Sequence, residues 1–145
     1  MIYRNARQSD LPGIQNFLAE RNLPCDDIAS HINNFVIIEV DNNIVAVGGL
    51  EIYDSVALLR SIAVSAKNKN IGLGKKILFL LEEKAILMGV KQFYLLTENA
   101  QNYFQKFGFS IIERDKVPSV IKLTKQFTSL CPDSAIAMTR DLNHQ

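Results

Sequence analysis

Lysine and glycine residues between positions 69 and 75 have the types and the spacing that bind a phosphate group. Lys69, Gly72 and Gly74 follow the pattern basic-x-x-Gly-x-Gly, and Lys75 adds a further positive charge. Glycine has no Cβ, so a backbone N–H group beside it can approach an anion closely. A helix that begins here would add its unsatisfied N–H groups and the positive end of its dipole. We therefore expect this segment to hold a phosphate-bearing ligand.

Two widespread phosphate-binding motifs do not fit the segment. A Walker P-loop requires a glycine where this chain has Lys69, and a serine or threonine where it has Lys76. A dinucleotide-binding GxGxxG loop requires glycine or alanine at the position of Ile77. The segment alone also leaves open an ordinary strand-to-helix turn with two glycines that binds nothing.

Hydrophobic periodicity predicts the elements that position the segment. The apolar run 58–64 predicts a buried strand before the glycines, and the spacing in 75–88 predicts an amphipathic helix after them. A right-handed crossover through this helix makes the strand at 92–97 parallel to the first strand. Strands are expected at 2–6, 35–40, 44–52, 58–64, 92–97, 109–114 and 134–142, and helices at 10–21, 26–33, 75–88, 99–106 and 117–127. The order predicts an α/β domain.

Length and composition are those of a soluble protein with one domain, residues 1–145. The chain has a net charge of +1 and is 48% hydrophobic, which suits a single folded core. It has no basic patch typical of nucleic-acid binding, no apolar run long enough to span a membrane and no signal peptide. Its two cysteines, Cys25 and Cys131, have no metal-ligand spacing. We expect a cytoplasmic protein that binds neither nucleic acid, membrane nor metal.

The element order and the pattern at Lys69, Gly72 and Gly74 resemble the GCN5-related N-acetyltransferase (GNAT) family over nearly the whole chain. Residues 99–109, which end in Lys-Phe-Gly-Phe, are similar to the family's helix before its penultimate strand. The resemblance implies a mixed, largely antiparallel sheet with a parallel strand pair at the acetyl-coenzyme A site, flanked by helices. Lys69 stands where the family usually has Arg or Gln, so the bidentate fork of arginine is missing.

The resemblance also implies which residues contact the coenzyme. Ile62, Ala63 and Val64 would hold the pantetheine arm where the two parallel strands splay apart. The pyrophosphate would be cradled by Lys69, Asn70, Ile71, Gly72, Leu73, Gly74 and Lys75. Many family members have a tyrosine at the position of Phe104 that protonates the departing thiolate. Phe104 is therefore expected to pack against the arm, and no general acid is assigned.

Three residues with reactive side chains are expected to be structural. Tyr103 neighbours Phe104, but adjacent residues of a helix point in different directions, so packing is favoured over catalysis. His31 is isolated in the sequence, which favours a surface or packing role. Cys131 has no histidine nearby in the sequence, and direct transfer to an amine needs no acyl-enzyme.

Glu51 and Arg60 are the candidates on the acetyl-acceptor side. Glu51 ends an apolar strand and could take the proton that an amine must lose before it attacks a thioester. Arg60 is a lone charge in an apolar strand and suits a substrate carboxylate. If the intervening turn holds two or four residues, Glu51 lies opposite Leu58 and diagonal to Arg60. An internal Glu51–Arg60 ion pair that only anchors the hairpin is the alternative.

Residues 118–142 indicate which subfamily the chain resembles. Segments 125–127 and 129–135, together with Glu51 and the strand at 58–64, resemble the subfamily encoded beside arsenic-resistance genes. They are also distantly similar to the acetyltransferase domain of glutamate N-acetyltransferases. The resemblance implies acetyl transfer from acetyl-coenzyme A to the amino group of a small molecule, an amino acid or a glutamate-like compound. Acetylation of a protein or peptide and a coenzyme-binding domain without turnover stay open as alternatives, and a homodimer is also allowed.

Overall fold

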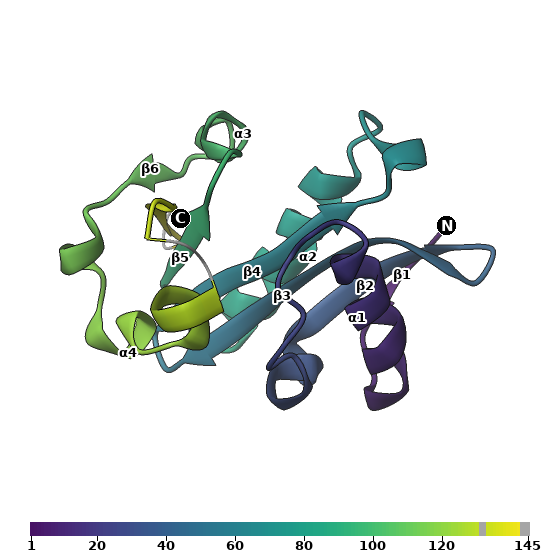
Figure 1. Cartoon of the computed structure of the whole chain (residues 1–145), viewed down its shortest axis with the longest axis horizontal. Coiled ribbons are helices and arrows are strands. Elements are labelled where there is room, and N and C mark those ends of the chain that lie inside the picture. The colour runs from purple at the N-terminus through teal and green to yellow at the C-terminus, as the bar shows by residue number, and fades with distance from the viewer. Residues whose placement is uncertain (131–132, 143–145) are drawn as a thin grey trace.

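One mixed sheet runs through the residues that the computed structural model describes, which are 1–130 and 133–142 (Figure 1). Its strand order is β1-β2-β3-β4-β5-β7-β6. The strands are β1 (Ile2–Asn5), β2 (Phe35–Val40), β3 (Asn43–Tyr53), β4 (Val56–Val64), β5 (Gln92–Thr97), β6 (Ser110–Ile111) and β7 (Ile136–Asp141). Only β4 and β5 are parallel, and the other neighbours are antiparallel. The predicted fold class is confirmed.

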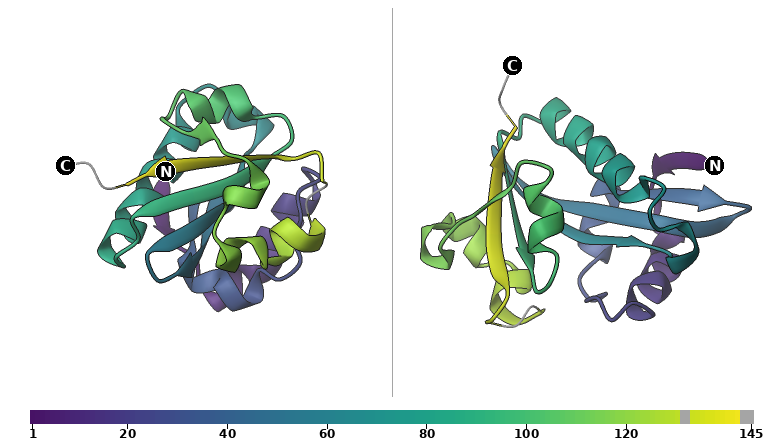
Figure 2. Two further views of the ribbon diagram at one scale, coloured as in Figure 1. Left: turned by 90° about the vertical axis from the view of Figure 1, so that its left-hand side faces the viewer. Right: turned by 90° about the horizontal axis from the view of Figure 1, so that it is seen from above.

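Helices cover both faces of the sheet (Figure 2). The α-helices are α1 (Leu11–Ala19), α2 (Leu73–Leu87), α3 (Gln101–Gln105) and α4 (Ser119–Lys122). Short segments are η1 (Gln8–Asp10), η2 (Ala29–Asn34), η3 (Ala66–Asn68), η4 (Arg114–Lys116) and the π-helical η5 (Gln126–Leu130). Within the described ranges, no helix combines the length and the apolarity that crossing a membrane requires.

Strand alternation divides the core between the two faces. Successive side chains of a strand point to opposite sides. Val36 and Ile38 of β2 therefore pack in the cluster that contains α2, whereas Phe35 and Ile37 pack with α1 and with Ile32 of η2. A third cluster joins α4 and η5 to β4, β5 and β7. The segment after η4 thus closes over the sheet beside the β3–β4 turn.

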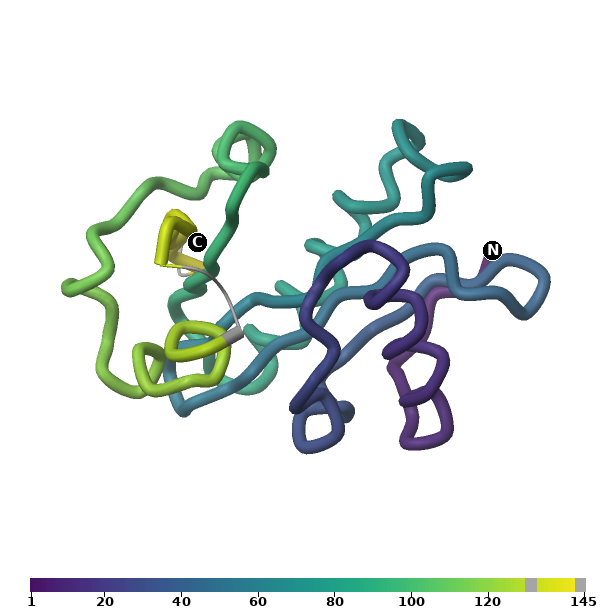
Figure 3. Tube along the Cα trace, viewed as in Figure 1, coloured from purple at the N-terminus to yellow at the C-terminus, as the bar shows by residue number. Residues whose placement is uncertain are grey.

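The parallel strands separate soon after they meet. Val56–Leu58 pairs with Gln92–Tyr94, and the pairing stops there. Figure 3 shows the traces of β4 and β5 diverging beyond these pairs. A bulge helps to turn β4 away, because Ser61 and Ile62 together stand opposite Gly48. Ser61 adopts a left-handed φ of 61°, which a residue other than glycine adopts only under constraint. The splay implied by the family resemblance is therefore present.

Several elements differ from their predicted extents. The helix expected at 26–33 is only η2, because Asp27 takes a φ of 58° and the carbonyl of Asp26 turns toward Arg60. The helix expected at 117–127 is broken into α4 and η5, and the strand expected at 109–114 is reduced to β6. Tertiary contacts decided these segments, since their local periodicity is weak. Cys131 lies outside the described residues.

Candidate active site

The glycine segment forms the N-terminus of α2, and the helix begins earlier than predicted, at Leu73. Gly72 is the N-cap with a φ of 87°, and Asn70 has a φ of 67°. No side chain caps the helix, and its first backbone bond runs from the N–H of Lys76 to the carbonyl of Gly72, at 3.0 Å. The N–H groups of the first turn are therefore left for a ligand. Alternating left-handed residues before a helix also favour anion binding.

Tyr103 is the aromatic residue that reaches the glycine segment. A Cβ built on Gly74 would overlap the Tyr103 hydroxyl, so only glycine permits this approach. Burial raises the pKa of Tyr103, which keeps its hydroxyl protonated. Phe104 is instead only 8% exposed and packs edge-to-face on Phe109 with ring centroids 5.6 Å apart. Its contact with a coenzyme arm stays a prediction, and the sequence alone did not indicate where Tyr103 points.

The residues predicted to hold the pantetheine arm lie at the splay. Ile62, Ala63 and Val64 belong to the part of β4 that has passed its last pair with β5. Their other edge pairs with β3, through Ala46 and Val47. In the described chain the edge facing β5 has no strand partner there, so its backbone groups can bind a ligand. We call residues 62–64 and 69–75, which the family resemblance predicts to bind the coenzyme, the coenzyme side.

Glu51 and Arg60 meet as their register requires. The β3–β4 turn holds two residues, and Glu51 lies opposite Leu58, as predicted. The Arg60 Nη1 donates to the Glu51 Oε2 at 2.7 Å and to the Asp27 Oδ1 at 2.8 Å. The side chains of Arg60 and Glu51 are 0% and 2% exposed. The internal ion pair that the sequence left open is therefore present, and it includes a third member.

The other N–H groups of Arg60 also have internal partners. Its Nε donates to the Ser61 Oγ at 2.9 Å, and its Nη2 lies 3.5 Å from the carbonyl oxygen of Asp26. The guanidinium also lies 5.9 Å from the ring centroid of Phe35. Because the side chain has no exposed surface, Arg60 offers no group to a substrate anion in this structure.

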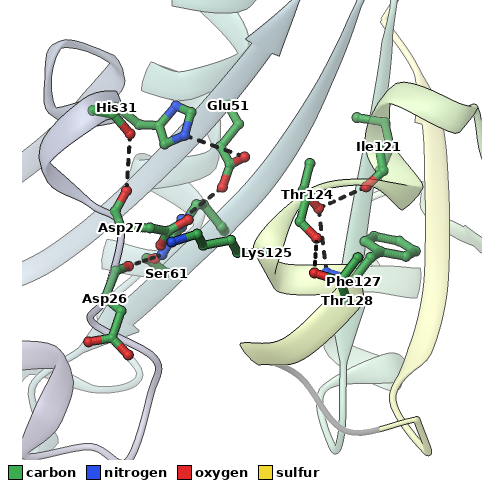
Figure 4. Close-up of polar contacts among 12 residues, drawn as sticks. Asp26, Asp27, His31, Glu51, Ser61, Ile121, Thr124, Lys125, Phe127 and Thr128 are labelled. Carbon is green, nitrogen blue, oxygen red and sulfur yellow. Dashed lines mark hydrogen bonds and ion pairs between the residues drawn. The ribbon is translucent and has the colours of Figure 1, made fainter.

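Tyr53 and His31 complete a group of side chains around Glu51, and Figure 4 shows His31 facing the Glu51 carboxylate. The Tyr53 hydroxyl donates to the Glu51 Oε1 at 2.6 Å, and the His31 Nε2 lies 3.5 Å from the same oxygen. Burial, and then the bond to the Glu51 carboxylate, raise the pKa of Tyr53 well above its usual value. We call Asp27, His31, Glu51, Tyr53 and Arg60 the charge cluster. Sequence reasoning missed His31, because no spacing relates it to Glu51.

A cavity of about 420 Å³ opens beside the charge cluster. Asp27, His31 and Glu51 line it together with Thr124 and Lys125 of the α4–η5 segment, and Figure 4 shows this segment facing the charge cluster. Lys125 is exposed and has no ion-pair partner among the described residues. A larger cavity of about 640 Å³, lined by β7 residues and Gly108, contains none of the predicted site residues.

The charge cluster contains possible metal ligands, but its charge is already balanced in part. Ligand atoms of Asp27, His31 and Glu51 lie within 4.8 Å of one another. The guanidinium of Arg60 contacts two of the three, at 2.8 and 2.7 Å. A divalent cation would have to displace or approach this positive charge, which is electrostatically unfavourable. The donor set therefore fits an ion-pair network better than a metal centre.

A mixed sheet with a splayed parallel pair, and a glycine segment at the helix that joins the two strands, define the acetyltransferase class of α/β domains. Residues 4–109 match the family model described as the acetyltransferase (GNAT) family. The chain belongs to this family.

Relatives and solved structures agree with this assignment. The amino-acid acetyltransferase of Pasteurella multocida is 26% identical over 126 residues, which are 79% of this chain but 28% of that protein. The chain thus spans under a third of its length. An uncharacterized N-acetyltransferase of Chlorobaculum tepidum is 26% identical and covers 96% of this chain and 95% of its own length.

Among solved structures, N-acetylglutamate synthase from Neisseria gonorrhoeae, complexed with coenzyme A and N-acetyl-glutamate, has a TM-score of 0.83 at 22% identity. The match covers 99% of this chain and 35% of that one. A GNAT-family acetyltransferase from Staphylococcus aureus has a TM-score of 0.78 at 20% identity, over 98% of this chain and 99% of that one. At this level of identity, both matches bear on the fold.

Proposed function

We propose that the chain transfers an acetyl group from acetyl-coenzyme A directly to the amino group of a small molecule, an amino acid or a glutamate-like compound. The observation that carries this proposal is the position of the splay. Beyond the last β4–β5 pair, β4 offers free backbone groups next to the α2 N-terminus. The strand also carries Arg60 of the charge cluster, so donor and acetyl-acceptor sites adjoin on one element.

The proposed donor site uses backbone groups for the coenzyme's anionic part. Lys69, Asn70, Ile71, Gly72, Leu73, Gly74 and Lys75 are the residues that we propose for the pyrophosphate. Unsatisfied N–H groups and the helix dipole bind such an anion without a specific side chain. Ile62, Ala63 and Val64 would pair with the pantetheine arm as a strand partner does. The solved synthase, which contains coenzyme A, supports this choice of donor.

The proposed chemistry removes one proton before attack. An ammonium group is not nucleophilic, so it must first lose a proton. The negative charge of Glu51 favours this loss. The neutral nitrogen then forms a bond to the thioester carbonyl carbon, the C–S bond breaks, and the second nitrogen proton leaves with the thiolate as a thiol. Thiols are good leaving groups, with an ordinary pKa near 8.5. No covalent enzyme intermediate is needed.

An amino acid as acetyl acceptor is supported by two observations. Several relatives are named amino-acid acetyltransferases, and the solved synthase was complexed with N-acetyl-glutamate. The lining of the cavity beside Glu51 also carries charge of both signs, from Lys125 and from the carboxylates of Asp27 and Glu51. An amino acid presents an ammonium and a carboxylate and would match both charges. The subfamily linked to arsenic resistance, a cytoplasmic location and a homodimer remain predictions of the sequence.

A panel of acetyl acceptors, read by release of free thiol, tests the proposal. We expect turnover with free amino acids and none with their N-methylated quaternary forms, which have no proton to lose. Turnover restricted to peptides would replace the proposal with peptide acetylation. Tight binding of acetyl-coenzyme A by calorimetry, with no turnover on any amine, would instead indicate a coenzyme-binding domain.

A further inference from the structure

We propose that His31 is the base that takes the proton from the attacking amine, and that Glu51 positions it. This inference rests on the proposed function, because it assigns a step of the acetyl transfer. It also gives a role to a side chain whose isolation in the sequence indicated only packing.

Glu51 and His31 differ in how much of each side chain is exposed to the cavity. The Glu51 side chain is 2% exposed, and its two oxygens accept bonds of 2.6 Å from Tyr53 and 2.7 Å from Arg60. Almost none of the carboxylate is open to a substrate amine. The His31 side chain is 22% exposed and lines the same cavity. A proton acceptor must come within hydrogen-bond reach of the amine, and of these two side chains His31 is the more accessible from the cavity.

The contact with Glu51 decides which ring nitrogen of His31 is free. The Nε2 faces the Glu51 Oε1 at 3.5 Å, longer than an ordinary hydrogen bond, and such catalytic contacts often tighten when substrate binds. A carboxylate beside Nε2 favours the tautomer that carries its proton there. Nδ1, which has no hydrogen-bond partner among the described residues, then presents its lone pair.

The charge cluster leaves negative charge beside His31. Asp27 and Glu51 carry two negative charges, the buried Arg60 compensates one of them, and Tyr53 stays neutral because its pKa is raised. One negative charge therefore remains next to the imidazole, and Lys125 also lines the cavity.

The proton and electron changes balance. The ammonium transfers one proton to the Nδ1 of His31, which gives a neutral amine and an imidazolium ion held by Glu51. The amine lone pair forms the N–C bond while the C–S bond breaks. The remaining excess proton on nitrogen leaves with the sulfur as a thiol, and the imidazolium returns its proton to water.

The test compares the wild-type protein with His31→Gln, His31→Asn, Glu51→Gln and the His31→Gln/Glu51→Gln double variant. Asn33→Ala is the matched control, because Asn33 is an exposed residue of the same segment, η2, and does not line the cavity. The readouts are kcat and kcat/KM for an amino acid across pH, coenzyme affinity by calorimetry and thermal unfolding. Two histidine variants are included so that the comparison still stands if one of them fails to fold. His31→Ala with added imidazole tests chemical rescue.

We expect His31→Gln to lower kcat by about 10²–10⁴ near pH 7 and to leave coenzyme affinity unchanged. The loss should shrink at high pH, where the amine deprotonates by itself, and added imidazole should restore part of the rate in His31→Ala. The double variant should lose no more than the worse single variant, because the two residues act as a unit. A folded His31→Gln variant with a normal pH profile, or strictly additive losses, overturns the inference. If the wild type acetylates no amine, the proposed function fails first and the inference falls with it.

Discussion

The coenzyme side and the charge cluster are built in opposite ways. The coenzyme side consists of consecutive residues, 62–64 and 69–75, and offers backbone groups that no side chain caps. The charge cluster combines side chains from the loop before η2, from η2, from β3 and from β4, and its central members are buried. A site made of backbone can be changed without loss of the fold. A change in a buried ionic site costs more stability, because each partner keeps another charge satisfied.

Glu51→Gln should show the largest effect on activity and none on coenzyme binding. The amide keeps the shape but loses the charge that drives proton removal, so kcat should fall by about 10²–10⁴ at pH 7. The deficit should narrow at high pH as the amine loses its own proton. Steady-state kinetics against pH and calorimetry with acetyl-coenzyme A provide the check. A near-normal kcat at pH 7 refutes the role, and a deficit constant across pH indicates substrate positioning.

Arg60→Gln should show the largest effect on stability. The substitution leaves the buried carboxylates of Asp27 and Glu51 without their shared cation, which costs about 3–5 kcal/mol of the free energy of unfolding. Urea unfolding measures the loss. Lys116→Gln is the matched control, because the Lys116–Glu113 pair is 70% and 72% exposed. The control should be nearly neutral, and equal losses in both variants would contradict the contrast between the two regions.

Gly72→Asp should affect coenzyme binding more than folding. It places a side chain and a negative charge at the α2 N-terminus, so the affinity for acetyl-coenzyme A should fall at least about tenfold, or about 1.4 kcal/mol. Gly89→Asp is a close control at the other end of α2. Gly72 and Gly89 have φ values of 87° and 85°, and an added Cβ meets no atom within 4 Å at either. Equal affinities in the two folded variants would remove the pyrophosphate assignment.

Lys125→Gln should give the smallest effect. If Lys125 attracts the carboxylate of the acetyl acceptor, KM for amino acids should rise by about twofold to fivefold, the size of an exposed ion pair. KM for an amine without a carboxylate, and coenzyme affinity, should not change. Lys122→Gln serves as the control, since the Lys122 Nζ donates to the carbonyl of Asp115 and does not line the cavity. A parallel change in KM for both classes of amine would argue against charge recognition.

Local sequence patterns made the secondary structure of the coenzyme side predictable. The glycine spacing, the apolar run of β4 and the periodicity of α2 predicted strand, loop and helix in order. Even the opposition of Glu51 and Leu58 followed from a short turn between two strands. Segment 26–33 and the α4–η5 segment were less predictable, because contacts with distant residues, such as Arg60 with the Asp26 carbonyl, shaped the former.

The sequence by itself therefore determined the sheet elements other than β6, the parallel pair and the glycine segment, since each depends mainly on neighbours within one strand, turn or helix. Only the tertiary structure decided that Arg60 is enclosed by Asp27 and Glu51, that His31 reaches Glu51 across 20 sequence positions, and that Tyr103 reaches Gly74. The physical reason is the distance along the sequence over which each interaction acts. Hydrophobic periodicity acts over a few residues, whereas the partner of a buried charge is set by which segments the packed core brings together.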